Sequence, residues 1–292
     1  MRYEELISDM TWSYSRLTGF ESCPYKWFLT YVYRDEFGRM LEKRSSFFAE
    51  FGTLMHSCME HYLKGEIPKD KLPDYYQDQF PEVVLDAAPT DSMLEKYYNQ
   101  GLEYCRDFSF PERKILGIEE RISFDFGGYK WRGIIDVVSE DENGALCITD
   151  HKSHMLRPRS GRTKPTKYDE ELDEYLRQLY IYAAAYQQKT GVYPEWLEFN
   201  CFRSGYFIRE PFSLERLQEV EEWAERTVKE IAENSDWKPV PDYWQCHYLC
   251  DVCRWCKFKT CKPEDVVDVS SADEMDIYRG VSYLQEIGRA AM

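Results

Sequence analysis

The chain has 292 residues, of which 43% are hydrophobic and 31% charged, and its formal net charge is -16 at pH 7. This composition excludes an intrinsically disordered chain, and the length fits one large domain or a domain with an insertion. The acidic balance argues against a protein that coats nucleic acid nonspecifically, since that function needs a broad positive potential. No stretch approaches the roughly 18 apolar residues of a membrane span, and the start of the chain lacks a signal-peptide pattern. We therefore expect a cytoplasmic protein with no membrane partner.

Helical patterns dominate the first part of the chain. Residues 1–50 are expected to form an N-terminal helical segment, in which Pro24 suits the first turn of a helix. Residues 51–112 form a second helical region, where "LMHSCMEHYL" places apolar residues at helical spacing and Gly65 follows as a stop.

The pattern changes over residues 113–240, which we expect to be the main mixed core. "KILGIEERISFDF", "RGIIDVV" and "ALCITDHK" are rich in β-branched and aromatic residues and predict three successive antiparallel strands. A helix from about Asp169 to Lys189 follows and ends at Gly191. The sequence then predicts a hairpin turning at Gly205 and a helix opened by Ser213.

The end of the third strand carries chemically distinctive residues. Alternation along a strand places Asp150 and Lys152 on one face and His151 on the other. Asp136, on the preceding strand, meets Asp150 on the same face only if the hairpin loop has an odd number of residues. A three-residue loop at 142–144 satisfies this condition.

Two carboxylates that converge in this way repel each other, so a divalent cation between them is the simplest explanation for their proximity. Mg²⁺ or Mn²⁺ suits oxygen ligands, and a nearby lysine can orient a water nucleophile and offset charge on a phosphate. A bare D-x-K triplet is expected about once by chance in a chain of this length, and alone it is more often a solvated strand end. The upstream aspartate and the loop parity favour the site.

Four motifs in order, "GTLMH", "RGIIDVV", "ITDHK" and "RQLYIY", resemble the RecB-type branch of the PD-(D/E)XK nuclease superfamily over about residues 12 to 262. That branch includes the AddB nuclease domain, CRISPR-associated adaptation exonucleases and phage recombination exonucleases. The resemblance implies an α/β fold, a restriction-endonuclease-like core with a mixed central sheet flanked by helices. It also implies N- and C-terminal segments joined by a cysteine metal cluster.

The resemblance implies roles for five residues around this strand end. Asp136 and Asp150 would be ligands of Mg²⁺ or Mn²⁺, and Lys152 would be the catalytic lysine. The His151 carbonyl would be a further ligand, and His56 of "GTLMH" would be the histidine ligand contributed from a helix.

Weaker correspondences extend the site. Gln178 and Tyr182 match the family's Q-x-x-x-Y element, and four residues apart they share one helix face near the active site and DNA. Glu119 resembles the acidic metal ligand of the first strand, although Glu120 is an alternative. His61 is a neighbouring alternative to the helix histidine.

The segment 241–264 is rich in cysteine and precedes an acidic tail, 265–292. Its C-x2-C-x4-C spacing lets a short loop present three thiolates to one metal centre. In the resembling nucleases the fourth ligand of a 4Fe-4S cluster comes from near the N-terminus. The implied cluster ligands are Cys23, Cys253, Cys256 and Cys261. With Cys246 and Cys250, the segment could instead form a local Zn²⁺ site.

The window "RPRSGRTKPTK" is the most basic part of this acidic chain. Its cations could follow a phosphate backbone beside the metal site, although such a segment can also be a solvated connection. The candidate DNA-binding residues are Arg157, Arg159, Arg162, Lys164 and Lys167.

The resemblance implies a metal-dependent DNA exonuclease that hydrolyses phosphodiester bonds in recombination, repair or CRISPR adaptation. The acidic surface favours a narrow channel for a single-stranded end. The alternative is a non-catalytic DNA-end-binding scaffold, a partner of a helicase or recombinase.

Overall fold

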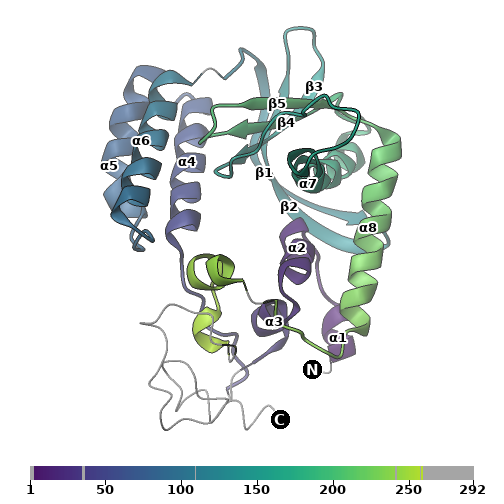
Figure 1. Ribbon diagram of the computed structural model, residues 1–292. Coiled ribbons are helices and arrows are strands. Elements are labelled where there is room, and N and C mark those ends of the chain that lie inside the picture. Colours follow the sequence, from purple (N-terminus) through teal and green to yellow (C-terminus); the bar gives the residue numbers. More distant parts are fainter. Residues whose placement is uncertain (1–2, 35–36, 109, 241, 257, 259–292) are drawn as a thin grey trace. The chain divides into compact units, whose positions relative to one another are not determined.

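The computed structural model describes residues 3–34, 37–108, 110–240, 242–256 and 258 (Figure 1). These residues form two compact units, each assembled from segments distant in sequence. The core unit consists of Thr11–Tyr14 and Ala49–Thr227. The terminal unit comprises the described residues of Met1–Met10, Ser15–Phe48 and Val228–Met292.

The core unit is built on one five-stranded sheet. Its strands are β1 (Lys114–Phe126), β2 (Tyr129–Glu140), β3 (Leu146–Lys152), β4 (Trp196–Cys201) and β5 (Phe207–Pro211), in the order β1-β2-β3-β4-β5. The first three strands are antiparallel as predicted, β3 pairs with β4 in parallel, and β4 pairs with β5 antiparallel. The sheet is therefore mixed, as expected. The parallel pairing of β3 with β4 requires a crossover connection between these two strands.

The hairpin between β2 and β3 has the predicted loop parity. The backbone N–H of Asp141 donates to the carbonyl of Ala145 at 3.0 Å, which closes the hairpin around residues 142–144. The last loop residue is a glycine with φ 80°, a left-handed conformation that glycine adopts without steric cost.

Helices cover the sheet of the core unit. Three of them, α4 (Phe47–Leu63), α5 (Leu72–Val83) and α6 (Asp91–Asp107), lie beside one another (Figure 1). Aromatic contacts join them: the rings of Phe51 on α4 and Tyr97 on α6 lie 5.0 Å apart, and those of Phe80 on α5 and Tyr98 on α6 lie 4.9 Å apart. A 3-10 turn, Lys69–Lys71, precedes α5.

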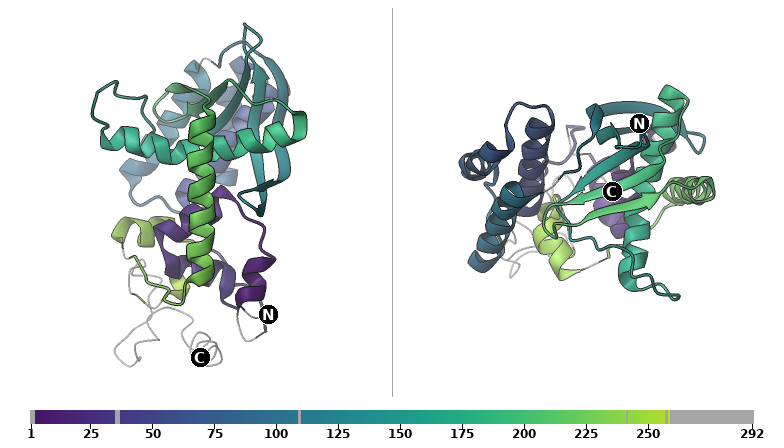
Figure 2. Two further views of the ribbon diagram at one scale, coloured as in Figure 1. Left: turned by 90° about the vertical axis from the view of Figure 1, so that its right-hand side faces the viewer. Right: turned by 90° about the horizontal axis from the view of Figure 1, so that it is seen from above.

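The crossover helix α7 (Lys167–Thr190) packs against β1, β3 and β4. A capping box formed by Thr166 and Asp169 opens it, and Gly191 ends it with φ 83°. The helix α8 (Leu214–Glu233) begins directly after Ser213, as predicted, and its first part crosses α7 (Figure 2). Among the helices in the described part of the chain, none combines the length and apolar character needed to cross a bilayer.

The terminal unit contains short helices, α1 (Tyr3–Ser8), α2 (Tyr14–Ser22), whose first residue belongs to the core unit, and α3 (Pro24–Trp27), which starts at Pro24 as predicted. Single turns follow at Phe28–Val32, Gln245–Leu249 and Cys253–Trp255. The indole of Trp27 stacks on that of Trp237 at 5.6 Å, so segments from both ends of the sequence share one core.

Candidate active site

Asp136 and Asp150 occupy opposing positions on β2 and β3. Val137 pairs with Thr149 in this antiparallel ladder. The residue before Val137 and the residue after Thr149, the two aspartates, therefore lie opposite each other. Their side chains leave the same face because side chains alternate along each strand. Both aspartates are buried.

The β3 side chains that face α7 form one hydrogen-bonded group. The amide Nε2 of Gln178 donates to Asp150 Oδ1 at 2.9 Å and to the hydroxyl of Tyr182 at 2.9 Å. Lys152 Nζ donates to Gln178 Oε1 at 2.7 Å. A Cβ at Gly133, on β2, would lie 2.7 Å from the Tyr182 ring, so glycine admits that ring against the sheet. Four residues predicted for the site therefore come together here.

His151 contributes through its backbone, while its ring turns to the other face of the sheet. Its N–H donates to Asp136 Oδ2 at 2.7 Å, and its carbonyl lies 3.1 Å from Nε2 of His56. Its ring lies 5.4 Å from that of Phe202, and Asn200 Nδ2 donates to its Nδ1 at 3.1 Å. Burial lowers the pKa of His151 well below its usual value, so the ring is neutral at neutral pH.

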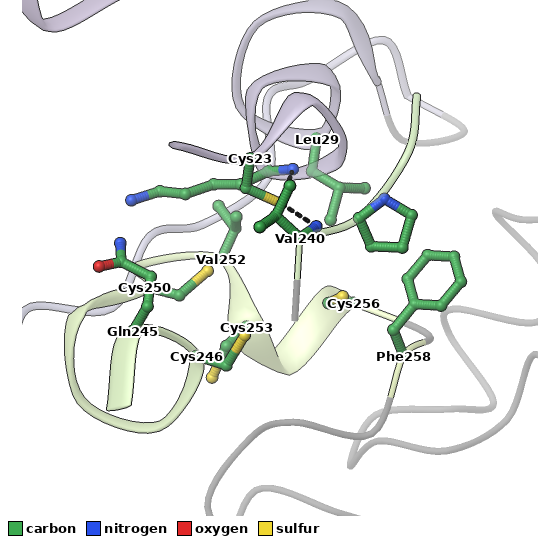
Figure 3. A pocket seen from close by; sticks show the side chains of 12 residues that line it. Cys23, Leu29, Val240, Gln245, Cys246, Cys250, Val252, Cys253, Cys256 and Phe258 are labelled. Carbon is green, nitrogen blue, oxygen red and sulfur yellow. Dashed lines mark hydrogen bonds between the residues drawn. The ribbon is translucent and has the colours of Figure 1, made fainter. Parts of the chain in front are cut away.

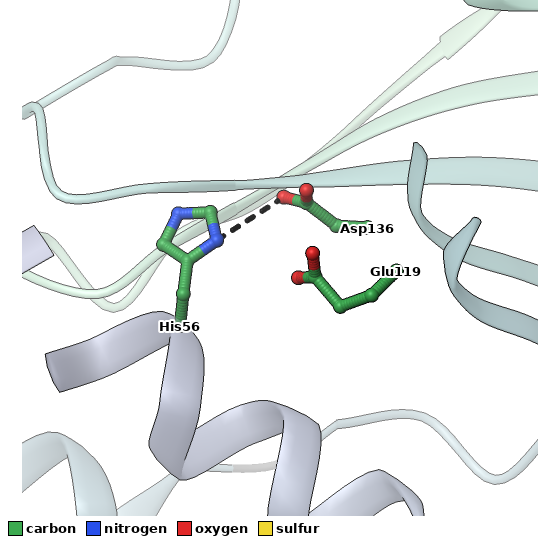
Figure 4. Close-up of side chains that lie close together, drawn as sticks. All are labelled: His56, Glu119 and Asp136. Atoms are coloured by element: carbon green, nitrogen blue, oxygen red, sulfur yellow. Dashed lines mark ion pairs between the residues drawn. The ribbon is translucent and has the colours of Figure 1, made fainter. Parts of the chain in front are cut away.

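His56, Glu119 and Asp136 present three candidate metal ligands to one point (Figure 4). One ligand atom from each lies within 4.8 Å of the others, and His56 Nδ1 is 3.6 Å from Asp136 Oδ2. One imidazole nitrogen and two carboxylates suit Mn²⁺, and the carboxylates suit Mg²⁺. The nearby His151 carbonyl would add an oxygen donor.

Glu119 reaches this group through an unusual backbone. It has φ 52° within β1, and no other non-glycine residue in the described ranges has a positive φ. Such a conformation costs about 1–3 kcal/mol, and strain of this kind clusters at functional sites. Glu120, the alternative considered from the sequence, instead forms an ion pair with Lys189 at 2.6 Å. The other alternative, His61, pairs with Glu66.

The acidic groups of this site are held in an environment that opposes their charge. Burial raises the pKa of Asp136 well above its usual value, and the charge of Asp150 adds to the effect. Burial, with the charges of Glu60 and Asp150, also raises the pKa of Glu119. Burial lowers the pKa of His56, which keeps its imidazole neutral and able to ligate. A bound cation would offset the carboxylate repulsion.

Asp150 lies outside the group of three, and one of its oxygens has an ion pair but no hydrogen bond. Its Oδ2 is buried and accepts no hydrogen bond from the described residues. The ammonium of Lys152 lies 2.8 Å from this oxygen, but in a direction that does not make a hydrogen bond. Together with the three clustered ligands, this buried carboxylate gives a donor set that fits a divalent cation.

The predicted basic segment is exposed and partly engaged by acids. Arg159 donates to Glu210 at 2.6 Å and to Asp173 at 2.6 Å, so its charge is already compensated. The other cations of the segment, all exposed, are Arg157, Arg162, Lys164 and Lys167. Arg157 also lies over the ring of Tyr168 at 4.2 Å.

Sequence reasoning missed the residues in and directly after β4 that support the site. Asn200 and Phe202 contact the ring of His151, and Tyr104 donates to Asn200 Oδ1 at 2.8 Å. The sequence signal was Asn200, which with Glu198 interrupts the otherwise apolar run "WLEFNCF". Its meaning depends on the parallel pairing of β3 with β4.

The terminal unit gathers the candidate cluster cysteines around one pocket (Figure 3). The cysteines that line it are Cys23, Cys246, Cys250, Cys253 and Cys256. Cys23 Sγ accepts hydrogen bonds from the backbone N–H groups of Lys26 at 3.4 Å and Val240 at 3.5 Å. Its contact with Lys26 also caps α3. The remaining predicted ligand, Cys261, lies outside the described residues.

Comparisons with known proteins identify the family to which the chain is similar. The family model of the PD-(D/E)XK nuclease superfamily matches residues 11–261. The crystal structure of a "Putative exonuclease" from Eubacterium rectale is similar, with a TM-score of 0.46 and 15% identity, over 93% of this chain and 96% of that chain. The crystal structure of SSO0001 is similar at a TM-score of 0.25 and 19% identity, over 70% of this chain and 84% of that chain. A search of curated proteins finds no match.

Both TM-scores lie below 0.5, so the assignment depends on the family model, which spans most of the chain. The mixed sheet flanked by helices is the restriction-endonuclease-like fold expected from the motifs. The chain belongs to the PD-(D/E)XK nuclease superfamily.

Proposed function

We propose that this protein is a metal-dependent DNA exonuclease of the RecB type that hydrolyses phosphodiester bonds at single-stranded ends. The observation that carries the proposal is the convergence of His56, Glu119 and Asp136 within 4.8 Å. Asp150 and Lys152 adjoin this group on β3. Recombination, repair or CRISPR adaptation, with a helicase or recombinase partner, is the cellular role that the motifs favour.

The site residues have two roles: some bind the metal ion, and others place a positive charge near the reacting phosphate. His56, Glu119 and Asp136 would hold Mg²⁺ or Mn²⁺, with Asp150 and the His151 carbonyl alongside. The bound ion would supply Lewis acidity for the phosphoryl group and lower the pKa of an attacking water.

Lys152 brings the positive charge that phosphodiester hydrolysis needs near the reacting phosphate. Its ammonium can orient a water and offset the charge that develops as the water oxygen bonds to phosphorus and the leaving oxygen departs. Gln178 fixes the ammonium by accepting its hydrogen bond at 2.7 Å, while donating to Asp150. The lysine and the carboxylate are therefore positioned by the same amide.

The preference for single strands follows from charge. A chain with a net charge of -16 repels duplex DNA, and the exposed cations of residues 157–167 form only a short basic segment. A single strand that enters past this segment needs less positive surface than a duplex. We include Arg157, Arg162, Lys164 and Lys167 among its contacts, with Arg159 released from its acids if the segment rearranges.

We also propose that the cysteine pocket holds a 4Fe-4S cluster, with Zn²⁺ as the alternative. The two N–H···S hydrogen bonds to Cys23 support this, because such bonds stabilise thiolate ligands of iron-sulfur clusters. The ligands would be Cys23, Cys253, Cys256 and Cys261. A brown protein whose visible absorption disappears on oxidation supports the cluster, and a colourless protein with stoichiometric zinc contradicts it.

Digestion of end-labelled single-stranded and duplex DNA tests the main proposal. We expect degradation of single strands with Mg²⁺ or Mn²⁺, none with chelator, and a loss of at least about 100-fold in rate for Lys152→Ala. Lys130→Ala, an exposed lysine on β2, is the matched control and should match the parent. DNA binding without metal-dependent cleavage would instead favour the end-binding scaffold.

A further inference from the structure

A second cavity lies in the core unit, between α6 and the turn that joins β4 to β5. Its volume is about 420 Å³, within the range of sites that bind small ligands. Aromatic, amide and guanidinium groups line it together, including Gln100, Tyr104, Asn200, Phe202, Arg203 and Phe207. None of the residues assigned to ion binding or to the hydrogen-bonded group on α7 lines this cavity.

Arg203 is the distinctive group in the cavity. Its guanidinium lies over the ring of Tyr97 at 3.8 Å, and its Nε donates to Gln100 Oε1 at 3.0 Å. Within the described part of the chain no carboxylate pairs with it, although the exposed Glu103 and Asp107 lie on the cavity rim. Desolvation lowers its pKa, which is the direction expected for a half-buried cation without a counter-ion.

The cavity shares a wall with the candidate metal site. The Phe202 ring lies 5.7 Å from that of His56 and 5.4 Å from that of His151. Asn200 contacts His151 Nδ1 at 3.1 Å and accepts from Tyr104 at 2.8 Å. A group bound in the cavity would therefore be separated from the ion-binding group by one layer of side chains.

We propose that this cavity binds one unpaired nucleobase of the substrate strand, adjacent to the phosphate held at the metal site. The inference rests on the proposed nuclease function and deepens it. The planar guanidinium of Arg203 and the partly exposed ring of Phe207 can stack on any base, while the amide Nε2 of Gln100 can donate to its edge. A base inside such a cavity cannot remain paired, so the cavity selects a single strand or a frayed end.

A double-mutant cycle between protein and DNA tests this. Binding of labelled single strands is measured with Ca²⁺ replacing Mg²⁺, using an intact strand and strands with one abasic position moved along the sequence. For the parent, we expect one position at which loss of the base weakens binding roughly 5- to 100-fold, the range for one base stacked on an aromatic group. For Arg203→Ala, the intact strand should bind more weakly and the same position should show no further loss.

Arg203→Lys guards against a folding defect, because it keeps the charge and loses the planar guanidinium; it should also lose the positional effect. Arg106→Ala, an exposed arginine on α6 outside the cavity, should behave like the parent. The same positional penalty in the parent and both Arg203 variants, or no penalty at any position, overturns the base subsite and leaves the nuclease proposal standing. Failure of the parent to bind any DNA overturns both.

Discussion

Replacing Asp136 by asparagine should stabilise the metal-free protein and remove its stabilisation by metal. Asparagine keeps an oxygen that can accept the hydrogen bond from the His151 N–H, which lies 2.7 Å from Asp136 Oδ2 in the parent. It removes the negative charge, which burial and the neighbouring Asp150 both disfavour. The pKa of Asp136 is raised in the folded state. The contribution of this carboxyl to stability is therefore fully present below the pKa of a free aspartate, about 4, where the carboxyl is protonated in both states. This contribution is lost as the pH rises through the pKa of the folded state. Each unit of such a shift costs about 1.4 kcal/mol.

We therefore expect Asp136→Asn to gain at least about 1 kcal/mol at pH 8 in chelator, a rise of roughly 2–4 °C in Tm. The parent should gain about 2.7 kcal/mol when Mn²⁺ is present at 100 times its Kd, and the variant should gain little. In thermal unfolding, Asp136→Asn should therefore have the higher Tm in chelator, and the parent should have the higher Tm in Mn²⁺. Asp125→Asn, an exposed aspartate on β1, is the control and should follow the parent. A variant that is less stable in chelator, or that gains as much from Mn²⁺ as the parent, refutes the reasoning.

Two further predictions concern the same site. Gln178→Leu removes the amide that joins Lys152 to Asp150, so DNA cleavage should fall roughly 10- to 100-fold while Mn²⁺ affinity changes by less than about threefold, as measured by calorimetry; an equal loss of both would show that Gln178 supports ion binding instead. The raised pKa values of Asp136 and Glu119 mean that protons compete with the ion, so Mn²⁺ affinity should fall by up to about tenfold per pH unit for each proton displaced as the pH is lowered. Affinity that does not change between pH 8 and pH 6 would contradict that competition.

The arrangement around β2 and β3 could be predicted because it depends on local rules. Strand alternation and an odd loop placed Asp136 opposite Asp150, and helical spacing placed Gln178 and Tyr182 on one face of α7. These rules need only neighbouring residues, so sequence patterns contain them.

The contribution of Glu119 could not be derived in the same way. The sequence does not choose between Glu119 and Glu120, because the backbone at Glu119 takes a positive φ that no residue pattern announces. The cavity beside Phe202 is also hidden in the sequence, since it forms only when α6 packs near the β4–β5 turn. Long-range packing rather than propensity decides where this cavity forms.

The direct test of the central claim is Mn²⁺ binding to the parent and to Asp136→Ala, followed in each sample by digestion of end-labelled single-stranded DNA. We predict that the parent binds Mn²⁺ and degrades the strand, and that the variant loses both properties while remaining folded. Undiminished Mn²⁺ binding by the variant, or DNA degradation by the parent in chelator, would contradict the assignment of Asp136, with His56 and Glu119, as the ion-binding group of the nuclease.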